Sequence, residues 1–340
     1  MSDLKDGQSS VGEMPKNSDG IDIPMLSEAS CGLVAVTGAS GFIGKVLLAQ
    51  LLSEGWKVRV LTRESQKWAA SESVDVFVGD LVDTHDWTGF LSGVDVVIHA
   101  AAEIRQPDLM MAVNVQGPER LLHAAVAAGV RRWVQLSSVG AYGPSVSGVV
   151  DENTPEKPEG PYEKTKTLFD QLLRDAAKQS HLQICIVRPS NVYGPGMVNQ
   201  SLFQMMRMIR RGWFAYMGPA GASANYVHVN DVVSALLLCA ALPQAAGKTY
   251  NVSDWTTIEE LVEAMAKGMG VSAPTCRLSL GFMMLLARSL QWLPRWPLTV
   301  GRVHALSGRA RYTTQRIEQE LGWRASVLAE HGMQDLLAKG

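Results

Sequence analysis

The sequence has little cysteine, little net charge and no long apolar run, and each shortage argues against a class of protein. Its formal net charge of −2 offers no electrostatic surface for nucleic acid. The longest apolar stretch, around Leu280–Ala287, is followed by Arg288 and Pro294 and is too short to span a bilayer. The cysteines lack metal-binding spacing, so we predict no bound metal and a cytoplasmic protein with reduced core cysteines: Cys31, Cys185, Cys239 and Cys276.

Composition along the chain predicts three parts. Residues 1–30 are rich in Ser, Asp, Gly, Lys and Pro and hold no apolar run of signal-peptide length, which predicts a flexible tail. Residues 31–192 show the regular alternation expected of a dinucleotide-binding core. Residues 193–340 are less regular and richer in Met and Trp. We expect them to form mainly a substrate-binding region, with some segments returning to the core.

Short apolar runs alternate with helix-spaced segments from Gly32 onward. The predicted strands are Gly32–Thr37, Lys57–Leu61, Val74–Val78, Asp95–His99, Trp133–Ser137 and Gln183–Val187. The predicted helices are Ile43–Ser53, Leu109–Ala128 and Tyr162–Lys178. This alternation predicts an α/β fold with a Rossmann-type doubly wound parallel sheet. Further along, Tyr226–Val229 is predicted to be a strand and Asn251–Ser253 the end of another.

A glycine pattern joins the first strand to the first helix. Gly38 permits a tight turn, Gly41 lets the backbone approach a pyrophosphate, and Gly44 lets helix and strand pack closely. The first N–H groups of the helix then face the phosphates. The turn therefore predicts a bound dinucleotide, held by Gly38, Ser40, Gly41, Phe42, Ile43 and Gly44.

The end of the second strand bears on the choice of dinucleotide. An acidic residue there binds ribose hydroxyls, whereas an arginine accommodates a 2′-phosphate. Thr62 and Arg63 occupy this position. Arg63 favours NADP(H) over NAD(H); Arg59, within the strand, is a weaker candidate.

Tyr162 and Lys166 lie four residues apart at the start of a predicted helix, so they share one face. A nearby ammonium stabilises a phenolate and is expected to lower the pKa of Tyr162 toward a range useful for acid–base catalysis. Ser137 and Ser138 end the fifth predicted strand, where a hydroxyl can hold a substrate oxygen beside the phenol. These residues predict a hydride-transfer site.

These motifs together resemble the extended short-chain dehydrogenase/reductase family of epimerases, dehydratases and reductases, most closely its nucleotide-sugar branch. The likeness runs from about Leu33 to Trp323. The matching segments, besides the glycine turn, are Gly79–Leu81, His99–Ala102, Asn114–Gly117, Leu136–Ser138, Ala141–Gly143, Tyr162–Lys166, Arg188–Pro195, Tyr226–Val229, Asp231–Val232 and Leu321–Trp323.

The resemblance implies a role for each matching residue. Ser138, Tyr162 and Lys166 would be catalytic, and Lys166 would also bind the nicotinamide ribose. Asn191 would lie on the substrate side with Ser137, and Asn114 would lie in the active-site region or serve helix packing. The remaining implied cofactor contacts are Asp80, Leu81, Ala100, Ala101, Ala102, Pro189 and Val192.

The substrate stays open among three hypotheses. One is an epimerase or reductase acting at C4 of a nucleotide sugar. Another is a dehydrogenase or reductase of an apolar alcohol or carbonyl, as in 3β-hydroxysteroid dehydrogenases and dihydroflavonol reductases. The third is a non-catalytic NAD(P)-binding sensor. Ala224 and Asn225 stand where nucleotide-sugar enzymes often carry a phosphate-binding arginine, so we expect Arg309 or Arg311 to take that role.

An unusually apolar segment, 278–299, precedes the end of the likeness. It predicts buried helix or a lid over the pocket, and the alternative is a contact with a membrane surface or a lipid-linked substrate. Family members commonly form dimers through a four-helix contact. The resemblance therefore implies a homodimer joined through Leu109–Ala128 and Tyr162–Lys178.

Overall fold

The computed structural model describes residues 32–65, 74–197, 200–289 and 299–327 and the single residues Trp292, Gly332 and Leu336. All of them belong to one compact unit, Gly32–Gly340. The predicted tail and Cys31 lie outside the described residues. Within the described part, no helix combines the length and apolarity needed to cross a membrane.

A parallel sheet of seven strands forms the centre of the described part, in the order β11-β7-β5-β4-β1-β2-β3. Its apolar strands are buried except for the edge strand β3, as expected where helices cover both faces. The doubly wound sheet predicted from the sequence is confirmed. The bounds are β1 (Leu33–Thr37), β2 (Lys57–Thr62), β3 (Val74–Val78), β4 (Val94–His99), β5 (Arg132–Leu136), β7 (Gln183–Pro189) and β11 (Lys248–Val252).

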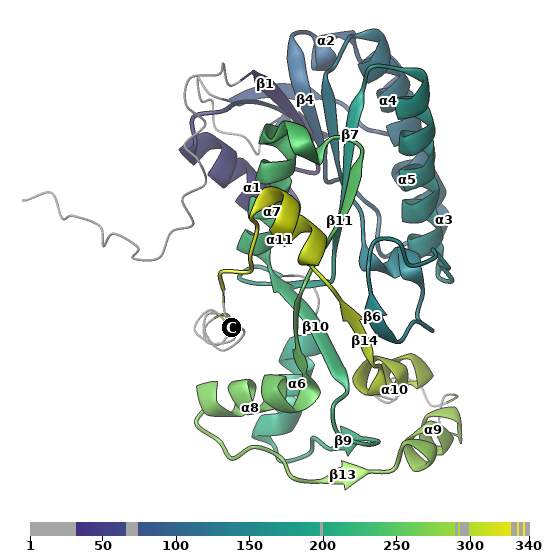
Figure 1. Cartoon of the computed structure of the whole chain (residues 1–340), viewed down its shortest axis with the longest axis vertical. Helices are drawn as coiled ribbons and strands as arrows, with labels where there is room; N and C mark the ends of the chain where they lie inside the picture. The colour runs from purple at the N-terminus through teal and green to yellow at the C-terminus, as the bar shows by residue number, and fades with distance from the viewer. Residues whose placement is uncertain are drawn as a thin grey trace, which may run out of the picture. The chain divides into compact units, whose positions relative to one another are not determined.

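Helices cover both faces of this sheet (Figure 1). One face carries α1 (Phe42–Ser53) and α7 (Val229–Ala241), which pack on each other. The other carries α4 (Gly117–Ala127) and α5 (Pro161–Gln179), whose apolar sides meet the sheet around Trp133 and Phe169. The first half of the chain also contains four shorter elements: α2 (Thr88–Leu91), α3 (Pro107–Met111), the 3-10 turn η3 (Val139–Tyr142) and β6 (Gly148–Val150).

The predicted helix Leu109–Ala128 contains a π-helical segment, η2 (Ala112–Gln116), between α3 and α4. The N–H of Gly117 donates to the carbonyl of Ala112, five residues back. Pro118 follows and has no N–H to donate, so the regular α-helical pattern cannot continue through this position. The widened turn places Asn114 in the interior, where it is buried.

The second half of the chain forms a lobe around Met205, Tyr216 and Leu261. Its elements, within the described residues, are β8 (Asn191–Tyr193), α6 (Ser201–Arg210), β9 (Tyr216–Met217), β10 (Ser223–His228), β12 (Asp254–Thr257), α8 (Ile258–Gly268), β13 (Arg277–Leu278), α9 (Leu280–Ser289), α10 (Val300–Ser307) and β14 (Ala310–Tyr312). Two further elements, η4 (Pro243–Ala245) and α11 (Gln315–Leu321), pack instead on α7 and β11. The order β12-β10-β8 defines its largest described sheet.

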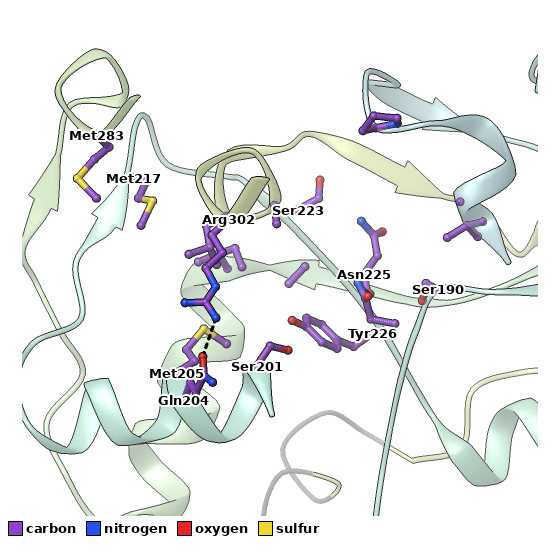
Figure 2. A pocket seen from close by; sticks show the side chains of 18 of the residues that line it. Ser190, Ser201, Gln204, Met205, Met217, Ser223, Asn225, Tyr226, Met283 and Arg302 are labelled. Atoms are coloured by element: carbon purple, nitrogen blue, oxygen red, sulfur yellow. Dashed lines mark hydrogen bonds between the residues drawn. The ribbon is translucent and has the colours of Figure 1, made fainter. Parts of the chain in front are cut away.

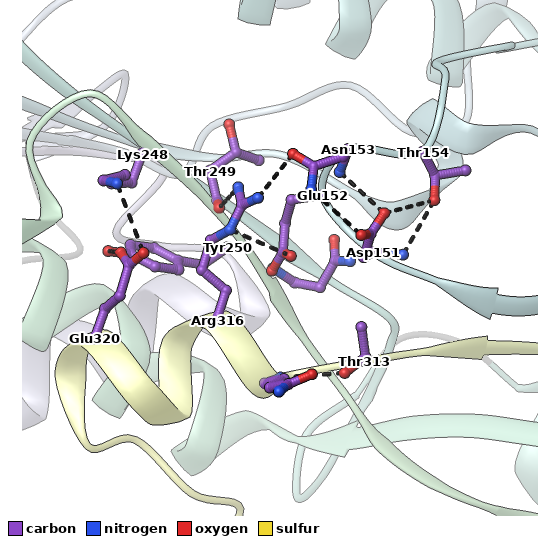
Figure 3. A network of polar contacts seen from close by, with 12 residues as sticks. Asp151, Glu152, Asn153, Thr154, Lys248, Thr249, Tyr250, Thr313, Arg316 and Glu320 are labelled. Atoms are coloured by element: carbon purple, nitrogen blue, oxygen red, sulfur yellow. Dashed lines mark hydrogen bonds and ion pairs between the residues drawn. The ribbon is translucent and has the colours of Figure 1, made fainter.

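Polar contacts fasten α11 to the edge of the large sheet (Figure 3). Arg316 pairs with Glu152 at 3.6 Å and donates to Asn153 at 2.9 Å. Glu320 accepts from the Tyr250 hydroxyl at 2.7 Å and pairs with Lys248 at 3.6 Å. The chain thus returns to β11 after building the lobe.

One prediction about the cysteines is wrong. Cys185 and Cys239 are buried free thiols, but Cys276 is free and exposed. Cys276 lies in the irregular stretch between α8 and β13, where no helix or strand covers it.

Candidate active site

The predicted site residues follow the carboxyl ends of β1, β2, β4, β5 and β7, which lie at one edge of the sheet because the strands are parallel. The strand order reverses between β1 and β4, and sheets of this kind bind ligands at such a point. The fold thus brings the glycine turn and the segments after the other strands to the same edge.

The glycine turn leaves no room for side chains at two of its positions. Gly38 has a φ of +74°, and a Cβ there would lie 2.5 Å from the backbone nitrogen of Ala101. A Cβ on Gly44 would lie 2.0 Å from the carbonyl oxygen of Gly38. Helix α1 begins after Gly41, and no side chain among the described residues caps it. Its first N–H groups therefore suit the phosphates of a dinucleotide, and the residues present fit that group.

A buried hydrogen-bond network holds the ends of β1 and β4 together. Thr37 Oγ1 lies 2.7 Å from His99 Nδ1 and accepts from the N–H of Ala101 at 3.3 Å. Burial, and then the charge of Lys166, hold the pKa of His99 well below its usual value, so His99 is neutral at pH 7. The segment Ala100–Ala102 is thereby fixed opposite Gly38.

The side chain of Arg63 is 78% exposed and lies 3.7 Å from the Asp80 carboxylate. Both follow strand ends at the predicted cofactor edge. Arg59, in contrast, pairs with Asp75 at 2.6 Å and donates to the carbonyls of Gly89, Phe90 and Ser92. Arg59 therefore serves the packing of β2, and Arg63 is the arginine available to a ligand.

Ser138 and Tyr162 line one cavity of about 850 Å³. The Ser138 hydroxyl also accepts from the N–H of Gly140 and thereby caps η3, the turn after β5. Lys166 is one helical turn beyond Tyr162 on α5 and is buried. The structure thus brings the three predicted catalytic residues to one region.

The pKa of Tyr162 differs from the expectation. Burial, followed by the negative charge of Asp170, raises the pKa of Tyr162 to about 12. Burial lowers the pKa of Lys166 to about 8, against the opposing effect of Asp170. The expected lowering of the Tyr162 pKa by Lys166 is therefore wrong: burial and the charge of Asp170 set this pKa, and both raise it. The phenol is therefore protonated at neutral pH.

The cavity extends from Tyr162 into the lobe. Figure 2 shows side chains that line it, among them Met205, Met217 and Arg302. Arg302 is the arginine of its described lining, and its Nη2 donates to Gln204 Oε1 at 2.9 Å. Asn191 lines the cavity, as predicted for the substrate side, and donates to the carbonyl of Asn225 at 3.0 Å. Most of the remaining lining is apolar: Met205, Met208, Phe214, Met217, Ile258, Leu278, Met283, Leu286 and Leu306.

Comparison with known proteins places the chain in a family. The family model for the NAD dependent epimerase/dehydratase family matches residues 34–253. The chain belongs to the NAD-dependent epimerase/dehydratase family. The resemblance to extended short-chain dehydrogenases/reductases is confirmed, and the protein is an enzyme of that type that uses a nicotinamide cofactor.

Relatives within this family act on different substrates. The chain is 31% identical to a UDP-glucose 4-epimerase of Mycolicibacterium smegmatis, over 69% of this chain and 82% of the relative. It is 29% identical to a 3 beta-hydroxysteroid dehydrogenase/Delta 5-->4-isomerase of Mycobacterium tuberculosis, over 73% and 72%. A structure of MoeE5 in complex with UDP-glucose and NAD has a TM-score of 0.68 and 27% identity, covering 91% of this chain and 98% of that one.

The site of this family member contains a buried ionic network behind the cavity. Asp170 Oδ2 accepts from the Ser137 hydroxyl at 2.7 Å and pairs with Arg188 at 3.1 Å. Arg188 also pairs with Glu156. Ser137 was predicted to bind substrate, but it is buried and bonded to Asp170, and it is absent from the described lining of the cavity. Ser138 is the serine that faces the cavity because successive residues of an extended chain point to opposite sides.

The structure also differs from the prediction for Arg309 and Arg311. Arg309 donates to the carbonyls of Pro219, Ala220 and Gly221. The Arg311 guanidinium lies 4.1 Å from the ring centre of Trp255. Neither is part of the described lining of the cavity. The sequence offered no motif for Arg302, which reaches the cavity because α10 lies close to β9 and β10.

Asn114 serves packing in this structure. Its side chain accepts from the N–H of Glu103 at 2.7 Å and donates to the Glu103 carbonyl at 2.9 Å and to Thr165 at 3.2 Å. These bonds connect the segment after β4 to helix α5, which carries Tyr162. Asn114 thereby ties α5, the helix of the predicted catalytic residues Tyr162 and Lys166, to the segment after β4.

Proposed function

We propose that the enzyme transfers a hydride between its nicotinamide cofactor and an oxygen-bearing carbon of an apolar alcohol or ketone. The observation that carries this proposal is the apolar wall of the cavity beyond Tyr162, in which Arg302 is the charged exception on the described lobe side. A wall of Met, Leu, Ile and Phe favours an apolar ligand, because burying apolar surface is favourable and burying an unpaired polar group is costly.

The chain's own residues have distinct tasks in this reaction. Ser138 holds the substrate oxygen by a hydrogen bond. In reduction, the Tyr162 hydroxyl, protonated at neutral pH, donates its proton to that oxygen. In oxidation, Tyr162 first loses its proton to solvent, and the phenolate then accepts the proton of the substrate alcohol. Lys166 stabilises the phenolate formed in the reductive direction. The bound cofactor supplies or accepts the hydride, and the apolar wall excludes water from the reacting carbon.

The test compares two substrates with wild-type enzyme and a Tyr162→Phe variant. A 3β-hydroxysteroid with oxidised cofactor and UDP-glucose are assayed separately for change in nicotinamide absorbance. We expect turnover of the steroid, and a loss of about 10²–10⁴-fold in kcat in the variant with cofactor affinity retained. Full activity of Tyr162→Phe would contradict the catalytic role, and no hydride exchange with either substrate class would favour a non-catalytic NAD(P)-binding sensor.

The second candidate is hydride transfer at C4 of a nucleotide sugar. Arg302 and Gln204 favour it, because a guanidinium inside the cavity can bind a diphosphate. The UDP-glucose bound to MoeE5 also supports it. An epimerase returns the hydride and leaves no net absorbance change, so conversion of UDP-glucose is followed by chromatography. Conversion of UDP-glucose without turnover of the steroid would replace the first candidate by this one.

We propose NADP(H) as the preferred cofactor, although MoeE5 was solved with NAD. The support is Arg63, exposed beside the end of β2, where Thr62 stands in place of an acidic residue. Replacing Arg63 by Ser is expected to weaken NADPH binding about tenfold and to leave NADH binding nearly unchanged, since one charged hydrogen bond contributes ~1.5–3 kcal/mol. Fluorescence titration of both cofactors measures this, and equal effects on both would contradict the preference.

We also propose a homodimer that forms through α3, α4 and α5. The support is exposed apolar side chains on these helices: Leu109, Met111 and Leu168. A cytoplasmic location remains our proposal, resting on the scattered spacing of the four cysteines.

A further inference from the structure

Charge is distributed unevenly along this nearly neutral chain. No Asp or Glu occurs between Asp175 and Asp231, where five Lys or Arg occur. No Asp or Glu occurs between Glu263 and Glu318 either, and that stretch contains eight Lys or Arg. These two stretches supply α6, α9 and α10 of the lobe. These parts of the lobe are therefore cationic, and its acidic residues are concentrated in the segment between the two stretches, which contains β12 and α8.

Helix α6 and the turn after it present both cationic and apolar side chains to solvent. Leu202, Met205, Met206 and Ile209 are buried against the lobe. Arg207, Arg210 and Arg211 are exposed on its other side. Trp213 is 70% exposed, with the Arg211 guanidinium 5.5 Å from its ring centre. Tryptophan beside arginine is typical of surfaces that meet lipid headgroups.

Helix α9 repeats this arrangement. Met283 and Ala287 are buried, and Met283 and Leu286 line the cavity. Phe282 and Leu285, three residues apart on the opposite side, are 53% and 65% exposed, and Arg288 next to them is exposed. Water thus contacts two large apolar side chains on a helix whose inner side forms the cavity wall.

The exposed apolar residues continue into the cavity. Met208 and Trp213 belong to its described lining and are also exposed to solvent, so they stand at its rim. We define the apolar rim as Met208 and Trp213, at the mouth of the cavity, together with Phe282 and Leu285, on the outer side of the helix whose inner side lines it. A route from the apolar rim to the space beside Tyr162 crosses mainly apolar side chains.

We propose that the apolar rim docks on an anionic lipid bilayer, with Arg207, Arg210, Arg211 and Arg288 against the headgroups. Charge complementarity favours this occupant, because exposed arginines share α6, the turn after it and α9 with the rim residues, and the stretches that build these elements contain no carboxylate. The acidic helix that packs on α6 is α8, where Glu259 is paired with Arg277 at 2.7 Å, Glu260 is bonded to Thr256 and Thr257, and Glu263 is exposed. Entry of a substrate from the bilayer rests on the proposed apolar substrate, whereas docking itself does not.

The experiment measures co-sedimentation of the full chain with vesicles, without any substrate. Phosphatidylcholine vesicles are compared with vesicles that also contain phosphatidylglycerol. We expect binding to the anionic vesicles that weakens as salt is raised. The double variant F282S/L285S, which changes no residue of the described cavity lining, should bind at least tenfold more weakly. Arg210→Gln and Arg288→Gln should each weaken binding about fivefold, since a basic residue near such a surface contributes ~1 kcal/mol.

Val149→Ser is the matched control, because Val149 is 73% exposed on β6, outside these elements. It should bind vesicles like the wild type, and circular dichroism should show all variants folded. Absence of binding to anionic vesicles, or equal binding by F282S/L285S, would overturn the proposal. Conversion of a dimer to a monomer by F282S/L285S, without vesicle binding, would overturn it in favour of a second copy of the chain. Vesicle binding without steroid turnover would leave docking intact and refute the proposed substrate alone.

Discussion

Lys166 is a residue at which the proposed chemistry opposes the stability of the fold. It is buried, and burial lowers its pKa from 10.5 to about 8. Below pH 8 the folded protein holds a buried ammonium ion. Between pH 8 and 10.5 the unfolded chain binds the extra proton, so this residue makes the free energy of unfolding rise with pH in that window.

Lys166→Met is therefore expected to stabilise the protein at pH 7 while abolishing activity. The gain in unfolding free energy should be on the order of 1–3 kcal/mol at pH 7, because one pKa unit corresponds to ~1.4 kcal/mol. It should shrink at pH 10, where the wild-type lysine is mostly neutral. Urea denaturation at both pH values measures this. A variant less stable than the wild type at pH 7 would show that attraction to Asp170 outweighs the cost of burial.

At the scale of elements, the turn between β1 and α1 depends on close backbone approach. The backbone atoms of Gly38 and Ala39 lie where a Cβ of Gly44 would be, so a side chain there must displace the turn. Gly129, which follows α4, has a φ of +74° but open space around its Cβ direction. The two glycines separate the effect of backbone strain from the effect of lost space.

Gly44→Ala should lower cofactor affinity at least tenfold, because the helix N-terminus would move away from the phosphates. Gly129→Ala carries only the strain of the left-handed conformation, about 1 kcal/mol, and should bind cofactor normally. Cofactor titration and thermal melting of both variants test this. Unchanged affinity in Gly44→Ala would mean that the turn is not the phosphate site.

At the scale of the whole molecule, the exposed side of α5 tests the proposed homodimer. Leu168 is 43% exposed there, on the helix that carries Tyr162. Leu168→Glu should convert a dimer into a monomer, since a buried unpaired charge at an interface is costly. Light scattering after size exclusion measures the mass, with Val149→Glu as the control. A monomeric wild type, or a Leu168→Glu variant that stays dimeric, would contradict this interface.

The sequence determined the sheet, the glycine turn and the positions of Ser138, Tyr162 and Lys166, because local patterns and short spacings encode them. Tertiary structure decided the rest. Ser137 faces Asp170, Arg309 and Arg311 are engaged elsewhere, and Arg302 reaches the cavity from a helix distant in sequence. The pKa of Tyr162 rises because of burial and the charge of Asp170, and no local motif reports either of them. Side-chain direction and desolvation depend on contacts between distant segments, and only the folded chain supplies them.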